Sequence, residues 1–271
     1  MFTRPIITLL RPLFVVLGLS IFTSASAEVA TVAVAATLRH AFEEISPLFT
    51  RDTGHTLRAT FGSSGNFYSQ IRQGAPFDVF LAADTEFPDR LVREKHASSP
   101  MVVYGEGRLV LMARTGGTVK TDPAMADLKA ALADGRLRKL AIANPALAPY
   151  GMRAQEALER VGLWEPIQPK LVLGENVGQA AQFASTGSAQ VAIVALSLAL
   201  APQLKGKVNY SLISASWHKP LKQGMVVINP ENKAGLALFE YMTSPPAQRV
   251  LKKYGYDVLA YATKPLMTKP N

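Results

Sequence analysis

The sequence predicts an α/β protein of two lobes, each a mainly parallel sheet flanked by helices. Short apolar segments of strand length alternate with segments whose apolar residues recur every three or four positions, the spacing of helices. This alternation is typical of βαβ units. A second such series follows the apolar segment 108–112, and a return segment, 225–228, precedes two C-terminal helices. A two-lobed, hinged binding protein needs this order: an α/β half, a crossover strand, a second α/β half and a return strand.

Residues 1–27 have the pattern of a secretory signal peptide. Arg4 and Arg11 form a basic start, 12–22 is apolar but too short to span a bilayer, and Ala25-Ser26-Ala27 is a typical cleavage site. We therefore expect export and cleavage after Ala27. An uncleaved membrane anchor is the alternative.

The composition limits the possible functions. The 244 residues that remain (271 − 27) suffice for one large or two smaller domains. The chain has no cysteine, which excludes disulfides, thiolate metal sites and cysteine nucleophiles. The formal charge of +9 falls to +7 without the two arginines of the signal. On an exported protein we expect this surplus to attract anions at long range rather than to bind nucleic acid.

The mature chain begins with a strand, a loop of small residues and a helix. Thr31 to Ala35 reads as the strand, and Thr37 is the predicted N-cap of the helix. The apolar residues that follow at helical spacing are Leu38, Phe42, Ile45 and Phe49.

The same arrangement recurs around Gly62-Ser63-Ser64-Gly65. The segment 57–61 alternates like a strand, and Phe67 and Ile71 lie four apart on a predicted helix. A helix N-terminus attracts anions, because its unpaired N–H groups and the positive end of its dipole converge there. Two serines and two glycines without a cation indicate an anion held by hydrogen bonds. The alternative is that the loop has a purely structural role, as in many α/β proteins.

The rest of the chain continues the alternation. Asp84 is the predicted N-cap of a helix at 87–95, and 97–100 reads as irregular. Further helices are predicted at 127–132, 152–161, 234–242 and 246–253, and further strands at 140–143, 171–173 and 190–194. The loops 144–151 and 174–178 each precede a helix.

An enzyme is the less favoured reading. The Gly62-Ser63-Ser64-Gly65 loop lacks the G-x-S-x-G spacing of a nucleophile elbow. The four histidines show no metal-binding spacing, and Glu43-Glu44 suits a solvated helix face. We therefore expect no catalytic residues, no cofactor and no metal bound as a free cation.

Three longer stretches carry a family resemblance: F-G-S-S-G-N at 61–66, Q-I-R-Q-G-A-P-F-D-V-F-L-A-A-D at 70–84, and N-P-A-L-A-P-Y-G-M-R-A-Q-E-A-L at 144–158. With them the chain resembles the periplasmic molybdate-binding proteins of ABC transporters over nearly all of its mature length. The resemblance implies a periplasmic protein that captures molybdate, with tungstate as a second ligand, and delivers it to the membrane permease of an ABC importer.

The resemblance also implies the architecture. It is a two-lobed periplasmic-binding-protein fold, type II-like, with the ligand in the cleft and with a monomer as the expected state. One lobe would comprise 28–108 together with 223–271, and the other 109–222.

The same resemblance implies which residues bind the anion. The two hydroxyls of the family fall on Thr37 and Ser64, and its backbone N–H donors fall on Ala35, Ala83 and Val177. Neutral donors suit a fully deprotonated tetrahedral dianion, because its oxygens only accept hydrogen bonds.

One position departs from the family pattern. Family members usually present a tyrosine hydroxyl after the I-V strand, where this chain has Ala195. Other members supply the phenol from the P-Y-G loop, which here gives Tyr150. Sulfate, another small oxyanion or a small organic anion on the same scaffold is the main alternative, and a pure interaction module is a further one.

Overall fold

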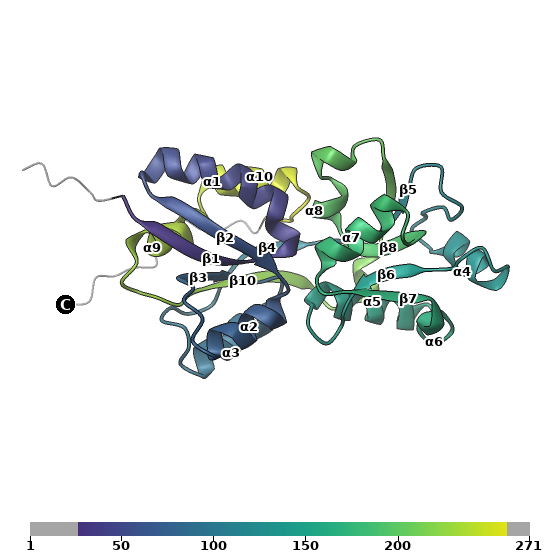
Figure 1. Cartoon of the computed structure of the whole chain (residues 1–271), viewed down its shortest axis with the longest axis horizontal. Coiled ribbons are helices and arrows are strands. Elements are labelled where there is room, and N and C mark those ends of the chain that lie inside the picture. Colours follow the sequence, from purple (N-terminus) through teal and green to yellow (C-terminus); the bar gives the residue numbers. More distant parts are fainter. Residues whose placement is uncertain (1–26, 259–271) are drawn as a thin grey trace, which may run out of the picture.

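The protein consists of two five-stranded sheets, each covered by helices, that lie side by side (Figure 1). This computed structural model describes residues 27–258, so the predicted signal peptide lies outside the described residues except for Ala27. Within 27–258, no helix has the length and apolar character needed to cross a membrane. The predicted α/β fold with two mainly parallel sheets is confirmed.

The first sheet has the strand order β2-β1-β3-β10-β4. Its strands are β1 (Val29–Ala35), β2 (Thr56–Gly62), β3 (Val79–Leu81), β4 (Val102–Gly107) and β10 (Leu221–Val227). Strand β1 pairs in parallel with β2 and β3, whereas β10 is antiparallel to both of its neighbours. All strands except β10 therefore run in one direction.

Helices cover both faces of this sheet (Figure 1). They are α1 (Arg39–Thr53), α2 (Ser64–Arg72), α3 (Glu86–Arg93), α9 (Lys233–Tyr241) and α10 (Pro245–Lys253). Side chains alternate between the two faces of a strand. Val32 and Val34 of β1 accordingly pack in a cluster with α1, α9 and α10, whereas Ala33 packs in a cluster with α2 and α3.

The second sheet has the order β7-β6-β8-β5-β9 and the same directional pattern, with β5 as the reversed strand. Its strands are β5 (Leu109–Arg114), β6 (Leu140–Ala143), β7 (Leu171–Gly174), β8 (Val191–Ala195) and β9 (Val208–Leu212). Its helices are α4 (Ala126–Ala133), α5 (Pro149–Arg160), α6 (Trp164–Ile167), α7 (Val177–Thr186) and α8 (Leu196–Ala199). Arg108 alone separates β4 of the first sheet from β5 of the second.

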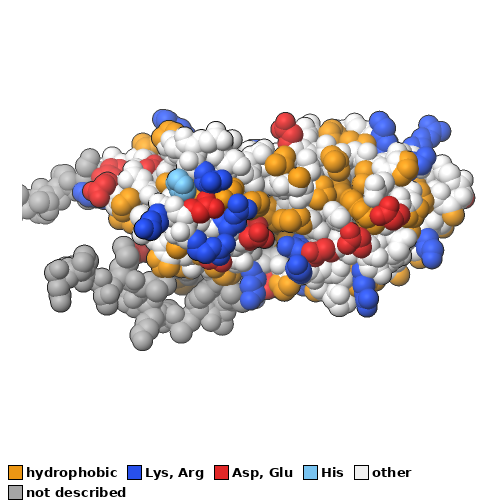
Figure 2. Space-filling model, turned by 90° about the horizontal axis from the view of Figure 1, so that it is seen from below, with side chains coloured by type: hydrophobic (Ala, Val, Ile, Leu, Met, Phe, Trp, Pro, Cys, Tyr) orange, Lys and Arg blue, Asp and Glu red, His pale blue; other side chains and the backbone are white. Residues whose placement is uncertain are grey.

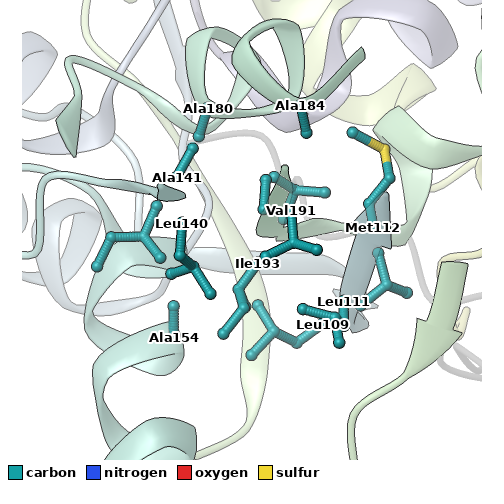
Figure 3. Close-up of a cluster of buried hydrophobic side chains, with 14 of the residues drawn as sticks. Leu109, Leu111, Met112, Leu140, Ala141, Ala154, Ala180, Ala184, Val191 and Ile193 are labelled. Atoms are coloured by element: carbon teal, nitrogen blue, oxygen red, sulfur yellow. The ribbon is translucent and has the colours of Figure 1, made fainter. Parts of the chain in front are cut away.

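Small side chains bring the helices close to the second sheet (Figure 3). Ala180 and Ala184 of α7 face the sheet from one side, and Ala154 of α5 faces it from the other. All three are fully buried, as are Val191 and Ile193 between them. The central strands β6 and β8 accordingly read as continuous apolar runs, which is typical of a sheet covered on both faces.

The topology brings the ends of the parallel strands together at the boundary between the sheets. In the first sheet β1, β2 and β3 lead into η1 (Ala36–Leu38), α2 and α3, and in the second β6, β7 and β8 lead into α5, α7 and α8. Ligands of open α/β sheets bind at these carboxyl ends. Hydrogen bonds between the loops of the two sheets, described below, show that the two edges face each other.

Candidate functional site

The loops that follow β1, β2, β3, β6 and β7 line one small cavity. All six donors named from the sequence line it: Ala35, Thr37, Ser64, Ala83, Tyr150 and Val177. The other lining residues are Ala36, Gly62, Ser63, Ala148, Pro149 and Asn176. Residues far apart in the chain thus converge from both sheets.

Thr37 contributes a buried hydroxyl without a partner. It lies in the short 3-10 helix η1, its side chain is 1% exposed, and its Oγ1 has no hydrogen bond within the described residues. The predicted N-cap role of Thr37 is wrong. The 3-10 turn makes Thr37 itself helical and places Leu38 at the N-cap of α1, and the threonine hydroxyl caps neither helix.

The two serines of the Gly/Ser loop have different roles. Ser63 is the N-cap of α2, and its Oγ accepts a hydrogen bond from the N–H of Asn66. Ser64 is the first residue of α2, and its buried Oγ accepts from the N–H of Ala83 at 2.9 Å. A hydroxyl oxygen that already accepts one bond still has its own hydrogen to donate. The Ala83 bond therefore fixes the Ser64 oxygen at the cavity wall.

Tyr150 provides a second buried hydroxyl without a partner. It lies in the first turn of α5, is 1% exposed, and its Oη has no hydrogen bond within the described part of the chain. Burial raises the pKa of this phenol well above its usual range, so the group is a neutral donor. Gly107 makes room for it, because a Cβ at this position would lie 1.9 Å from the Tyr150 oxygen.

The start of α7 supplies backbone donors. Asn176 is its N-cap, and its Oδ1 accepts from the N–H of Gln179 at 3.1 Å. Val177 is the first helical residue and is buried. The N–H of a first helical residue has no partner within its helix. Val177 is a donor implied by the family resemblance, whereas Asn176 is a site residue that was not predicted, although an asparagine directly before a helix is a typical N-cap signal.

The cavity is neutral, although the protein carries a positive net charge. None of the twelve lining residues is Asp, Glu, Lys, Arg or His. Lys and Arg side chains instead lie on the outer surface of both lobes (Figure 2). Helices η1, α2, α5 and α7 all begin at the cavity, so that N–H groups and dipoles supply its positive potential.

A larger groove adjoins the cavity. Its volume is about 570 Å³, and it shares Ala36 and Asn176 with the cavity. Arg39 and His40 of α1 line one side, and residues of α7 and α8 line the other. It therefore extends along the same boundary between the sheets.

Asp84 lies in the loop between β3 and α3 and is a buried carboxylic acid. It is 8% exposed and burial raises its pKa to about 7, with smaller contributions from Glu86 and Asp89. The structure places Thr85 rather than Asp84 at the N-cap of α3, although Asp84 Oδ1 accepts from the N–H of Phe87 at 3.4 Å. Only one of the two carboxyl oxygens is therefore hydrogen-bonded, because Oδ2 has no partner within the described residues.

We expect Asp84→Asn to flatten the pH dependence of stability. With a folded pKa of about 7 against 3.8 unfolded, Asp84 contributes stability that is fully present below pH 3.8 and is lost as the pH rises through 7. The Asp84 contribution to the unfolding free energy should fall by on the order of 1.4 kcal/mol per pH unit within this window, which is the expected difference in slope between the parent and Asp84→Asn. Urea unfolding of the ligand-free protein across the window measures the slope.

Glu231→Gln is the control, since Glu231 is an exposed glutamate between β10 and α9 and is not among the groups that shift the pKa of Asp84. Its unfolding free energy should change with pH as steeply as that of the parent. An Asp84→Asn variant with the slope of the parent would show that the carboxyl is ionised in the folded protein.

Comparison with known proteins agrees with this fold. The pattern of the bacterial extracellular solute-binding protein family matches residues 30–257. The molybdate-binding protein ModA of Rhodobacter capsulatus is 40% identical over 249 residues, which cover 90% of this chain and 93% of that protein. ModA of Azotobacter vinelandii is 38% identical over 254 residues, 92% of this chain and 98% of the relative.

A solved structure gives the same result. The periplasmic molybdate-binding protein of Azotobacter vinelandii superimposes with a TM-score of 0.76 at 29% identity, over 85% of this chain and 99% of that one. The resemblance inferred from the sequence motifs is confirmed, and so is the expectation of a binding protein rather than an enzyme. The chain belongs to the bacterial extracellular solute-binding protein family.

Proposed function

We propose that this protein captures molybdate, and tungstate as a second ligand, outside the cytoplasm and delivers it to the membrane permease of an ABC importer. The observation that carries the proposal is the pair of buried hydroxyls without partners, Thr37 Oγ1 and Tyr150 Oη, in a cavity that contains no charged side chain. Leaving a buried polar group unpaired costs about 1–3 kcal/mol. A ligand that only accepts hydrogen bonds removes that cost.

Molybdate fits this donor set. A fully deprotonated tetrahedral dianion accepts from hydroxyls and N–H groups and would be repelled by a carboxylate. Hydrogen bonds to a charged group are shorter and stronger than neutral ones, so fixed neutral donors can stabilise a desolvated dianion. Phosphate retains a proton near neutral pH and is bound best where a carboxylate accepts that proton, and no carboxylate lines this cavity.

We assign the direct contacts to the hydroxyls of Thr37, Ser64 and Tyr150 and to the N–H groups of Ala35 and Val177. The N–H of Ala83 acts on the anion through Ser64, because it donates to the Ser64 oxygen. This assignment refines the role implied by the family resemblance, in which Ala83 is a direct donor.

The proposal includes the cellular context. The chain would be exported to the periplasm, cleaved after Ala27 and active as a monomer. Its lobes would be 28–108 with 223–271, and 109–222, and they would close around the anion by hinge motion. The names of the relatives, which are molybdate-binding proteins, support the ligand and the location.

Isothermal titration of the mature protein with molybdate, tungstate, sulfate and phosphate tests the proposal. We expect molybdate and tungstate to bind at one site per chain and to displace sulfate, with phosphate the weakest. Tighter binding of sulfate than of molybdate would assign the protein to another oxyanion. The absence of heat with all four anions would contradict an oxyanion-binding function.

Tyr150→Phe should weaken molybdate binding with little change in the thermal stability of the ligand-free protein. The substitution removes a hydroxyl that has no partner in the described structure and keeps the ring that fills the site. Losing one bond to a charged ligand costs about 1.5–3 kcal/mol, or about tenfold to a hundredfold in Kd. Titration calorimetry and a thermal melt measure the two effects.

Tyr210→Phe is the control for this variant, because Tyr210 lies on the edge strand β9 and is 40% exposed. It should bind molybdate like the parent. Unchanged affinity in Tyr150→Phe would assign that oxygen of the anion to water or to a backbone donor.

A further inference from the structure

The carbonyl oxygen of Thr37 accepts hydrogen bonds from two buried hydroxyls. Ser197 Oγ donates to it at 2.7 Å, and Tyr256 Oη donates to it at 3.0 Å. The two hydroxyl oxygens are themselves 3.4 Å apart. The exposed fractions of Thr37, Ser197 and Tyr256 are 1%, 5% and 3%, so water does not compete for these bonds.

The two donors come from different lobes of the protein. Tyr256 follows α10 and packs in the hydrophobic cluster of the first sheet, to which β1 and α1 also belong. Ser197 lies in α8, directly after β8 of the second sheet. The bond from Tyr256 is therefore internal to the first lobe, whereas the bond from Ser197 joins the two lobes.

The C-terminal segment is shaped to fit against α8. Gly255 has a φ of +78°, and a Cβ there would lie 2.6 Å from Leu196 Cδ2. The approach of α8 to Tyr256 and Thr37 is thus close. This fit holds α8, and with it Ser197, in place beside Thr37.

Fixing the Thr37 carbonyl fixes the turn that carries the Thr37 hydroxyl. The described chain has no cis peptide bond, so the Thr37–Leu38 peptide is a planar trans unit. Two hydrogen bonds to its oxygen restrain the plane, and with it the 3-10 turn η1 that places Oγ1 in the cavity wall. The restraint from Ser197 comes from the second lobe.

We propose that Ser197 is a positioning residue that couples closure of the lobes to retention of the anion. It makes no contact with the ligand. Its hydroxyl holds the Thr37 turn in the closed form, so that the anion is released only after this bond breaks. The proposal rests on the oxyanion-binding function proposed above.

The test compares the kinetics of molybdate binding in the parent, in Ser197→Ala and in Ser216→Ala, an exposed serine in the 3-10 helix 215–217. A neutral hydrogen bond predicts a rise in the dissociation rate of about threefold to tenfold for Ser197→Ala. The association rate and the melting temperature of the ligand-free protein should stay at the parent values. Ser216→Ala should match the parent in all three.

Tyr256→Phe separates positioning from a general packing role. It removes the donor that belongs to the first lobe, so it should lower the melting temperature of the ligand-free protein, which Ser197→Ala should not do. The double variant leaves the carbonyl without either donor and should raise the dissociation rate by more than the product of the two single effects.

Several outcomes overturn the proposal. An unchanged dissociation rate in Ser197→Ala, or a loss of ligand-free stability equal to that of Tyr256→Phe, would make Ser197 an ordinary packing contact. If the parent binds sulfate and not molybdate, only the proposed ligand is wrong. The kinetic comparison of the variants is then made with sulfate. A parent that binds none of the four anions would overturn both proposals.

Discussion

Replacing Ser64 or Thr37 by alanine should weaken molybdate binding about tenfold to a hundredfold in each case. Both hydroxyls line the cavity, and a lost bond to a charged ligand costs about 1.5–3 kcal/mol. Titration calorimetry measures the change in Kd. Thr37→Ser keeps the hydroxyl and should bind nearly as tightly as the parent.

The two variants should differ in ligand-free stability. Ser64→Ala removes the acceptor of the Ala83 N–H, which then lacks a partner in a buried site, at a cost of about 1–3 kcal/mol. Thr37→Ala removes a hydroxyl that has no partner within the described residues, so unfolding should change little. If both alanine variants bind molybdate like the parent, the anion lies elsewhere.

Gly65→Ala should weaken molybdate binding about tenfold or more by obstructing closure. The N–H of Gly65 donates to the carbonyl oxygen of Leu147 at 2.9 Å, and this bond joins α2 of the first lobe to the loop before α5 of the second. A Cβ at Gly65 would lie 2.7 Å from the Leu147 oxygen. A backbone oxygen cannot rotate away, so the lobes must stay further apart.

Alanine favours a helix by about 1 kcal/mol over glycine, so the ligand-free variant should keep its stability. Small-angle scattering with molybdate should show less compaction than in the parent. Gln70→Ala, an exposed position on the same helix, is the control and should close normally. Parent-like affinity and compaction in Gly65→Ala would mean that the bound protein does not bring Gly65 and Leu147 this close.

Much of the fold is readable from the sequence because its strong signals are local. The spacing of Phe42, Ile45 and Phe49 predicts α1, and all three are buried. Strands β4 and β9 were not predicted. In β9 the run V-N-Y-S-L is half polar and exposes Tyr210 and Leu212, since an edge strand has less apolar surface to bury.

The residue types that line the cavity were predictable from the sequence, whereas the hydrogen bonds between them were not. Hydroxyls and small residues at helix starts point to Thr37 and Ser64 without any structure. The bond from Ala83 to Ser64 spans 19 positions and that from Tyr256 to Thr37 spans 219. No local pattern encodes such contacts, because they depend on how the sheets pack.

A crystal structure of the protein with molybdate tests the central claim most directly, because anomalous scattering locates the molybdenum. We expect one molybdenum atom in the small cavity, with its oxygens in hydrogen-bond distance of Thr37 Oγ1, Ser64 Oγ, Tyr150 Oη and the N–H of Val177. An anion found instead in the adjoining groove, against Arg39 and His40, would contradict a site built from neutral donors.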